Sequence, residues 1–274
     1  MDQDCRYCQG VNPQEAYFCM FCGKALVPPG KLPDNSRVVI TGMGMVSPLG
    51  VTLEQNWEAL LAGKSGVGRM TGIPNAERYP CNYSSEVKDF DPKNYMDHKS
   101  ARRMTEASQY AVAAAGMAYE DAGLEPTNMD PSRSGVVVGT AGGNSIVETE
   151  RAMRKMINKQ RISPIRFNSV WPNMAAFAIA RDFNCAGYNG TIVTACASGT
   201  QSLATAADAI RLGYVDTVIA GGTESLNSEV ALAGFSGIGA LSQCKDEPHK
   251  ASRPFDLDRD GLIPGEGAAM LVLE

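Results

Sequence analysis

Short apolar runs alternate with longer segments of helical period along most of the chain, and this alternation predicts an α/β layered domain. The apolar, β-branched runs predict strands at 37–41, 134–140, 191–195, 216–222 and 268–274. The segments of helical period predict helices at about 53–62, 104–122, 146–159 and 173–182, and a further helix that ends at Gly213. We therefore expect one sheet with helices packed on its faces.

The first of these helices has clear boundary signals. The segment Thr52-Leu-Glu-Gln55 resembles a capping box, and Gly63 follows the last helical position. Trp57, Leu60 and Leu61 are its large apolar positions. In the helix over 104–122, Met104 and Met117 are expected to pack in the core.

Composition narrows the class of protein. The 274 residues are 44% hydrophobic and 20% charged, which is typical of a globular chain and excludes disorder or a fibrous repeat. The formal net charge of −5 gives no reason to expect nucleic acid as a partner. No segment approaches the roughly 18 consecutive apolar residues of a membrane span, and no signal peptide is evident. We expect a cytoplasmic protein that does not bind a membrane.

The cysteines form two groups. Four of them lie in two C-x-x-C pairs near the N-terminus, at Cys5, Cys8, Cys19 and Cys22. Two such pairs can complete a tetrahedral four-thiolate shell, so we predict a structural zinc ribbon with a structural or docking role. A redox dithiol and a rubredoxin-like iron site are the alternatives. The predicted organisation is therefore a zinc ribbon over 1–26, a linker over 27–36 and a main domain over 37–274.

Among the other cysteines, Cys196 has the surroundings of a nucleophile. An apolar strand runs directly into it, and a helix-forming segment follows at once. Its neighbours Ala195, Ala197, Ser198 and Gly199 are small, as a tight strand-to-helix turn requires. The start of a helix stabilises a thiolate and offers backbone N–H groups to an oxyanion. The alternative is a buried core thiol. Cys81, Cys185 and Cys244 lack such small neighbours and are expected to be structural.

Two segments resemble ligand-binding motifs but lack residues that those motifs require. Gly42-Met-Gly44-Met-Val-Ser47 lacks the third glycine of a dinucleotide fingerprint, and Pro48 interrupts the helix that should follow. The acidic segment 256–267 resembles an EF-hand loop but has Gly267 where the bidentate glutamate belongs. His98 and His249 lie in polar stretches and are expected at the surface.

Two basic stretches stand out on this acidic chain. Lys99, Arg102 and Arg103 precede the Ala-rich helix. The second stretch comprises Arg151, Arg154, Lys155, Lys159, Arg161 and Arg166. Both fit solvated helix faces, and both also fit local docking of an acidic partner.

With these residues in view, 37–274 resembles the N-terminal half of a β-ketoacyl-acyl-carrier-protein synthase of the chain-elongating type. The matching segments run in order and include VVITGMGMVSPLG, SPIRFNSVWPNM, TACASG, IAGGTES and ASRPFDLDRDGLIPGEGAAMLVLE. The resemblance implies a thiolase-like fold, a homodimer, and a condensing enzyme of fatty acid or polyketide synthesis. Acyl groups would arrive on the phosphopantetheine of acyl carrier protein and pass to Cys196, before a decarboxylative Claisen condensation with malonyl carrier protein. No organic cofactor is implied.

The resemblance also assigns further residues. Phe235 and Gly142 fall where the acyl pocket is lined, and Phe167 falls near the dimer-side end of that pocket. Carrier-protein docking would involve Lys99, Arg102, Arg103 and Arg161. The ribbon and the linker are not part of the usual family pattern.

The departure from the family concerns the second half. There the family carries two catalytic histidines, a lysine and a Gly-Phe-Gly loop, and none of them is matched here. We therefore expect either a fragment of a longer chain or one subunit of a split enzyme, with an uncovered apolar face and a tendency to associate. The alternative is a non-catalytic subunit that binds carrier protein or assists assembly, with the ribbon as a docking module.

Overall fold

The computed structural model describes residues 3–4, 8–12, 37–244 and 247–274. Its strands are β1 Gln3–Asp4, β2 Val11–Asn12, β3 Ile40–Val46, β4 Gly68–Arg69, β5 Tyr83–Ser84, β6 Ser134–Gly139, β7 Asn189–Ile192, β8 Thr217–Ser225 and β9 Glu266–Leu273. Its α-helices are α1 Leu53–Leu61, α2 His98–Ala101, α3 Glu106–Asp121, α4 Gly143–Ile157, α5 Pro164–Phe167, α6 Met174–Asp182, α7 Ser198–Arg211, α8 Glu229–Gly237 and α9 Pro248–Ala251.

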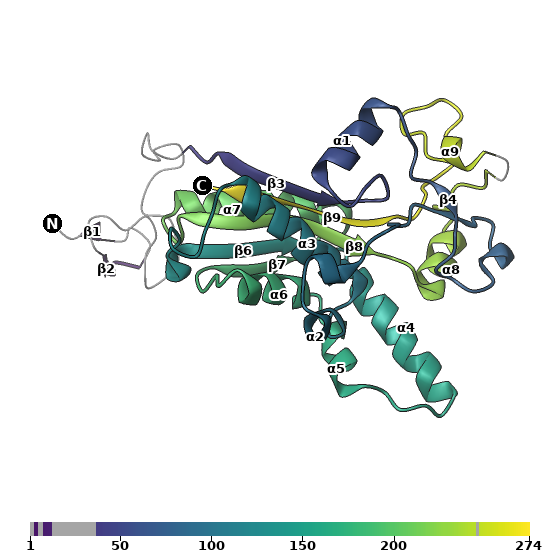
Figure 1. The fold of residues 1–274 in the computed structure, drawn as a ribbon, viewed down its shortest axis with the longest axis horizontal. Coiled ribbons are helices and arrows are strands. Elements are labelled where there is room, and N and C mark those ends of the chain that lie inside the picture. The colour runs from purple at the N-terminus through teal and green to yellow at the C-terminus, as the bar shows by residue number, and fades with distance from the viewer. Residues whose placement is uncertain (1–2, 5–7, 13–36, 245–246) are drawn as a thin grey trace.

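The centre of the domain is a mixed sheet in the order β3-β9-β8-β6-β7 (Figure 1). Strands β6, β7 and β8 are parallel, whereas β9 runs antiparallel to both of its neighbours. Helix α3 packs on β3, β8 and β9 and also against α6, while α7 packs on β6, β7 and β8. The predicted α/β layering is confirmed. Because β6, β7 and β8 are parallel, their carboxyl ends meet at one edge of the sheet.

Most of helix α3 is buried, which explains its alanines. Small side chains let the helix approach the sheet closely, and β3 has glycines at the points of contact. A Cβ atom on Gly42 would lie 2.1 Å from the carbonyl oxygen of Ala118, and one on Gly44 would lie 2.0 Å from that of Ala114. The glycines of the GMGMVS segment therefore serve helix packing, in agreement with the rejection of a dinucleotide site.

All five strands differ from their predicted bounds, and two of them are clearly displaced. The first was expected at 37–41 but runs over Ile40–Val46, because its glycines face α3 and its backbone pairs with β9. The strand expected at 191–195 ends at Ile192, because the chain turns sharply at Ala195. The apolar pattern also did not reveal α8 or the short pairs β4 and β5, which lack a clear period.

Helix α1 begins as predicted, since the Thr52 hydroxyl accepts a hydrogen bond from the Gln55 N–H at 3.2 Å. Its large apolar side chains nevertheless face solvent, with Trp57, Leu60 and Leu61 being 61%, 56% and 71% exposed. An uncovered apolar face was expected for this part of a synthase, and α1 presents apolar side chains of that kind. Strand β9 itself lies between β3 and β8 and packs against α3.

The N-terminal cysteines fall mostly outside the described residues. Strands β1 and β2 pair as an antiparallel hairpin, and Cys8 is exposed between them. Cys5, Cys19, Cys22 and the linker 27–36 lie outside the described part of the chain. Within that part, no three His, Cys, Asp or Glu side chains are grouped so that they could hold a metal ion. None of its helices is long and apolar enough to cross a membrane, and the cytoplasmic location stays a prediction.

Candidate active site

Cys196 lies at the carboxyl edge of the sheet, between the end of β7 and the start of α7. The chain leaves β7 at Ile192, forms a 3-10 turn over Ala195–Ala197 and enters α7 at Ser198. The Cys196 side chain is exposed, which excludes the alternative of a buried core thiol. The predicted strand-to-helix elbow is confirmed.

The elbow contains a backbone conformation that the sequence did not reveal. Ala195 has φ +52°, in the left-handed region that non-glycine residues seldom adopt. Such a conformation costs on the order of 1–2 kcal/mol and persists only where neighbouring contacts hold it. This conformation lies directly before Cys196, whose side chain is exposed.

A single buried hydroxyl makes the contacts that hold the elbow. The Ser198 side chain accepts a hydrogen bond from the Thr194 N–H at 2.8 Å and lies 2.7 Å from the Ala195 carbonyl oxygen. It also lies 3.0 Å from the carbonyl oxygen of Thr140, which follows β6. Ser198 therefore joins the turn after β7 to the turn after β6.

The backbone N–H of Cys196 is left outside the hydrogen bonds of the turn itself. Those bonds run from the Ala197 N–H to Thr194 and from the Ser198 N–H to Ala195. An exposed thiol beside the start of a 14-residue helix can attack a thioester carbonyl, and a nearby N–H can stabilise the resulting oxyanion. The geometry suits nucleophilic acyl transfer.

The turn after β6 forms a second wall of the site. Gly142 has φ +93°, and no heavy atom lies within 4 Å of the position that its Cβ would occupy. Glu224 at the end of β8 holds this turn, because its carboxylate accepts hydrogen bonds from the Ala141 N–H at 2.7 Å and the Thr140 hydroxyl at 3.3 Å. Burial raises the pKa of Glu224. The structure thus brings Gly142 and Cys196 to the same edge of the sheet.

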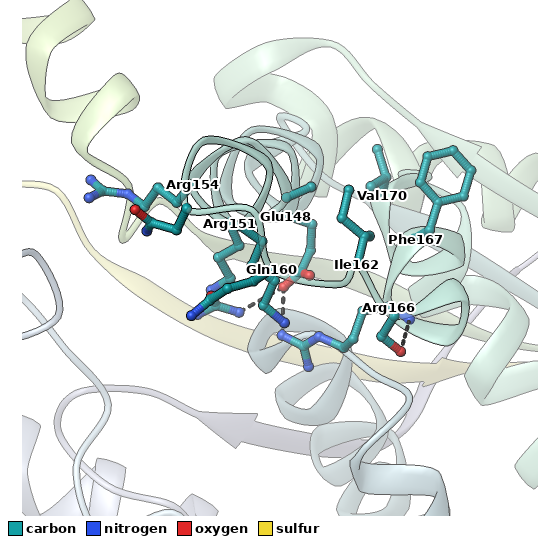
Figure 2. Close-up of a pocket in the computed structure, with 12 residues that line it drawn as sticks. Glu148, Arg151, Arg154, Gln160, Ile162, Arg166, Phe167 and Val170 are labelled. Atoms are coloured by element: carbon teal, nitrogen blue, oxygen red, sulfur yellow. Dashed lines mark hydrogen bonds and ion pairs between the residues drawn. The ribbon is translucent and has the colours of Figure 1, made fainter.

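The two phenylalanines lie in separate surroundings. Phe235 on α8 is half-buried against a small core that contains Ile73, Leu232 and Leu241. Phe167 at the end of α5 is 55% exposed and lines a pocket of about 400 Å³ between α4 and α5 (Figure 2). Neither Cys196 nor Gly142 lines that pocket. Within one copy of the chain, Phe167 is therefore not part of the Cys196 surroundings.

Three of the predicted docking residues form one cationic surface. Lys99, Arg102 and Arg103 line a hollow of about 490 Å³ together with His98 and Arg166. No carboxylate of the described residues forms an ion pair with Lys99, Arg102 or Arg103. Their charges are available to a partner. Arg161 is exposed but is not among the residues that line this hollow.

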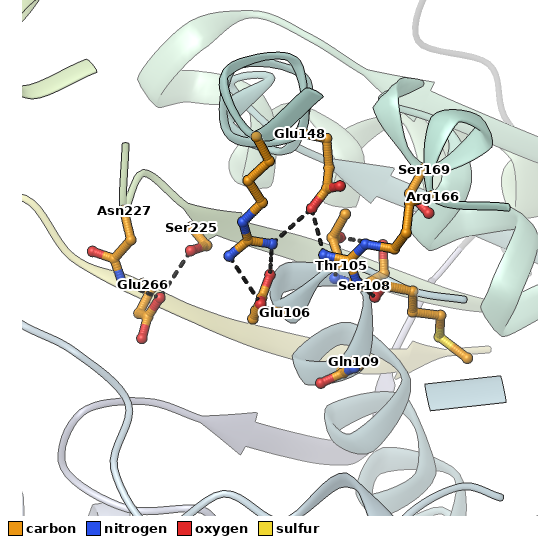
Figure 3. A network of polar contacts seen from close by, with 12 residues as sticks. Thr105, Glu106, Ser108, Gln109, Glu148, Arg166, Ser169, Ser225, Asn227 and Glu266 are labelled. Atoms are coloured by element: carbon orange, nitrogen blue, oxygen red, sulfur yellow. Dashed lines mark hydrogen bonds and ion pairs between the residues drawn. The ribbon is translucent and has the colours of Figure 1, made fainter. Parts of the chain in front are cut away.

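Much of the second basic stretch has a structural role instead. Glu148 on α4 is only 4% exposed, and its carboxylate contacts Arg151 and Arg166 at 2.7 Å each (Figure 3). Arg151 also binds Glu106 at the start of α3 through two contacts of 2.9 and 3.0 Å. Burial alone would raise the pKa of Glu106, but the Arg151 guanidinium brings it below its ordinary value. Arg151 and Arg166 were expected either on a solvated helix face or in a docking surface. They instead form ion pairs within the chain.

Comparison with known proteins agrees with this geometry. Residues 35–274 match the family model described as "Beta-ketoacyl synthase, N-terminal domain". The chain belongs to the β-ketoacyl synthase family. It is 41% identical over 242 residues to the 3-oxoacyl-[acyl-carrier-protein] synthase 2 of Coxiella burnetii, and 40% identical over 242 residues to that of Vibrio cholerae. In both cases the match covers 88% of this chain and 58% of the relative, so the chain spans little more than half of their length.

Solved ketosynthases have the same fold, which confirms the thiolase-like architecture. The ishigamide ketosynthase/chain length factor superimposes with a TM-score of 0.78 at 35% identity, covering 87% of this chain and 58% of that one. A type II polyketide synthase acyl-carrier protein in complex with its ketosynthase, AntDE:AntF, gives a TM-score of 0.73 at 29% identity, with coverage of 87% and 58%.

In this β-ketoacyl synthase domain, two groups at the site went unnoticed in the sequence. One is the Ser198 hydroxyl, which appeared only as a small residue of the TACASG segment. The other is Glu224, which follows the glycines of IAGGTES. Their partners are backbone groups of segments remote in sequence, so no local spacing pointed to them. The two histidines, His98 and His249, are exposed as predicted.

Proposed function

We propose that this β-ketoacyl synthase domain takes an acyl group from acyl carrier protein onto Cys196, as the first step of a condensation in fatty acid or polyketide synthesis. The observation that carries the proposal is the exposed Cys196 thiol on a strained elbow at the start of α7. The thiolate adds to the thioester carbonyl, a new C–S bond forms, and the phosphopantetheine thiolate leaves. The Cys196 N–H stabilises the oxyanion between these two events.

The later steps depend on groups that this chain does not match. Decarboxylation of malonyl carrier protein and the Claisen condensation would use the two histidines, the lysine and the Gly-Phe-Gly loop that the resemblance places in the second half. The chain spans 58% of its curated relatives, so we propose that the remaining part of such a synthase completes the reaction. Trp57 and Leu61 on α1, with their exposed apolar side chains, support association with a further protein surface.

The acyl pocket and the dimer are part of the same proposal. Open space at Gly142, beside the Cys196 elbow, supports a role of this turn in accommodating the acyl chain. Phe235 would line the pocket from α8, and the exposed Phe167 would close its far end from the other subunit of a homodimer.

Carrier-protein docking is assigned to the cationic surface of Lys99, Arg102 and Arg103, with Arg161 as a further contact. The absence of ion pairs to the first three within the described residues supports this role, since acyl carrier protein is the acidic partner implied by the resemblance. Charge reversal of Lys99 and Arg102 to Glu should weaken carrier-protein binding about tenfold at low salt. Binding that stays unchanged would exclude this surface.

Self-acylation of the purified 274-residue chain tests the main proposal. The chain is mixed with acyl-loaded carrier protein, and intact-mass spectrometry measures the transfer. A mass increase equal to one acyl group, located on the Cys196 peptide, supports the enzyme. Carrier-protein binding without any transfer would favour the alternative, a non-catalytic binding or assembly subunit.

We also propose a structural zinc site at Cys5, Cys8, Cys19 and Cys22. The β1–β2 hairpin supports it, because Cys8 lies exposed between two paired strands, as expected for a ligand on a tight turn. Zinc would link the two C-x-x-C segments and stabilise their fold. About one zinc per chain after purification in reducing buffer is expected, and a value near zero, or iron in its place, would contradict it.

A further inference from the structure

We propose that Ser198 is a positioning residue, which aims the Cys196 backbone N–H toward the oxyanion that forms when the thiol is acylated. The inference rests on the proposed function of Cys196 and adds a residue to its machinery. Ser198 does not touch the reacting atoms in this account. It acts through the peptide that joins Ala195 to Cys196.

The Ser198 hydroxyl is placed to control that peptide. The residue is 2% exposed, so its hydroxyl group is shielded from water. The oxygen accepts the Thr194 N–H at 2.8 Å, and its single hydrogen can be donated to the carbonyl oxygen of Ala195 at 2.7 Å or of Thr140 at 3.0 Å. The Ser198 backbone N–H donates to the same Ala195 carbonyl. The backbone N–H of Ser198 therefore holds this carbonyl, and the hydroxyl can donate to it as well.

Because a peptide group is planar, a contact that fixes the Ala195 carbonyl also fixes the direction of the Cys196 N–H. The Ala195 carbonyl and the Cys196 N–H belong to one planar trans peptide and point in opposite directions. Holding the carbonyl against Ser198, at the buried start of α7, therefore directs the Cys196 N–H away from the helix. The Cys196 side chain next to this N–H is exposed.

The strain at Ala195 explains why such control is needed. Its φ of +52° is unfavourable for alanine, so the peptide would relax if nothing held it. The two groups bound by the Ser198 side chain, the Thr194 N–H and the Ala195 carbonyl, flank the Thr194–Ala195 peptide and Ala195 itself. The third contact, to Thr140, ties the elbow to the turn that contains Gly142.

Ser202 offers a matched control on the same helix. It is also completely buried, and its hydroxyl lies 2.7 Å from the Gly199 carbonyl oxygen and 2.6 Å from that of Gly221. It therefore ties α7 to β8 without contacting the elbow. Each substitution removes a buried hydroxyl of α7, but only Ser198→Ala removes a hydroxyl contact to the Ala195 carbonyl, which then keeps the backbone N–H of residue 198 as its donor.

The test compares two reactions of the Cys196 thiol in the full chain. Iodoacetamide alkylates the thiolate by displacement of iodide, without forming an oxyanion. The ester p-nitrophenyl hexanoate acylates the same thiolate through a tetrahedral oxyanion, which collapses with loss of p-nitrophenolate. Both rates are measured at one pH for the native protein, Ser198→Ala and Ser202→Ala, with mass spectrometry confirming Cys196 as the modified residue.

Ser198→Ala should lower the ratio of the acylation rate to the alkylation rate about tenfold, because only acylation uses the N–H donor. Ser202→Ala should leave the ratio unchanged. An unchanged ratio in Ser198→Ala, or an equal fall in Ser202→Ala, would overturn the inference. If Cys196 of the native protein reacts no faster than Cys244 with either reagent, the proposed function itself fails, which is a distinct result.

If Ser198→Ala does not fold, the same comparison can be made in a chain that also carries Ala195→Gly. Glycine adopts φ near +52° without strain, so Ala195→Gly removes the main cost of the elbow. Glycine is also free to leave this conformation, so the hydroxyl is still needed to hold the peptide. In that background Ser198→Ala should still lower the ratio, and an unchanged ratio would overturn the inference.

Discussion

Strand β7 separates two cysteines with opposite surroundings. Cys185 lies before the strand, is 8% exposed and donates toward the Phe183 carbonyl oxygen at 3.7 Å. Burial raises its pKa to about 11. Cys196 lies after the strand and is exposed at the start of α7. The same side chain is thus a packing group at one end of the strand and a candidate nucleophile at the other.

The difference follows from the direction of the parallel strands. At the carboxyl ends of β6 and β7, the chain turns into the helices α4 and α7, whose N-terminal ends favour a thiolate. Before the other end of β7, Cys185 packs in the core cluster that contains residues of α3 and α6. Whether a cysteine is available for reaction or packs in the core therefore depends here on which end of a parallel strand it lies at.

The largest effect should come from exchanging the two thiols for alanine. Cys196→Ala should abolish acyl loading from carrier protein, a loss of at least about 10³-fold, because the nucleophile is removed. Cys185→Ala should load at the native rate. Intact-mass measurement of the acyl adduct gives both values, and loading that survives in Cys196→Ala would break the comparison.

The pH dependence of stability should carry the signature of Cys185. Its folded-state pKa of about 11 lies above the value of about 9 for a free thiol, so the folded state retains the proton to higher pH. The contribution is fully present below pH 9 and is lost as the pH rises toward 11, by about 2 kcal/mol. Urea unfolding at several pH values gives the free energy of unfolding of the native chain and of Cys185→Ala, and the difference between them is the contribution of the thiol. An advantage of the native chain that stays constant up to pH 11 would contradict the buried thiol.

A smaller effect is expected on stability at neutral pH. Cys185→Ala should lower the free energy of unfolding by about 1–2 kcal/mol, because it leaves a small cavity between α3 and α6. Cys196→Ala should change it by less than about 0.5 kcal/mol, since the side chain is exposed. Chemical denaturation measures the free energy of unfolding of both variants. Equal decreases in the two variants would contradict the difference in burial.

The sequence was sufficient for features set by local pattern. The order of the main strands and helices, the cap at Thr52 and the elbow at Cys196 all follow from apolar period and turn residues. The bounds of β3 could not be predicted in this way, because its glycines are explained only by the approach of α3. The exposure of Trp57 was likewise hidden, since an apolar period does not say which surface covers it.

The roles of the basic residues could not be predicted from the sequence either. Lys99 and Arg151 looked alike as members of basic stretches, and only the fold separates them. Arg151 meets Glu106 from the start of α3 and Glu148 from its own helix, whereas no carboxylate among the described residues pairs with Lys99. Such pairings join segments remote in sequence, so spacing alone does not predict them.

The most direct test of the central claim is alkylation of the native chain with limiting iodoacetamide at pH 7.5, followed by peptide mapping. We expect Cys196 to be labelled at least about 100-fold faster than Cys185 or Cys81, because burial raises the pKa of both of these thiols. The half-buried Cys244 should fall between these extremes. Labelling of Cys196 at a rate no higher than that of Cys244 would contradict its assignment as the nucleophile.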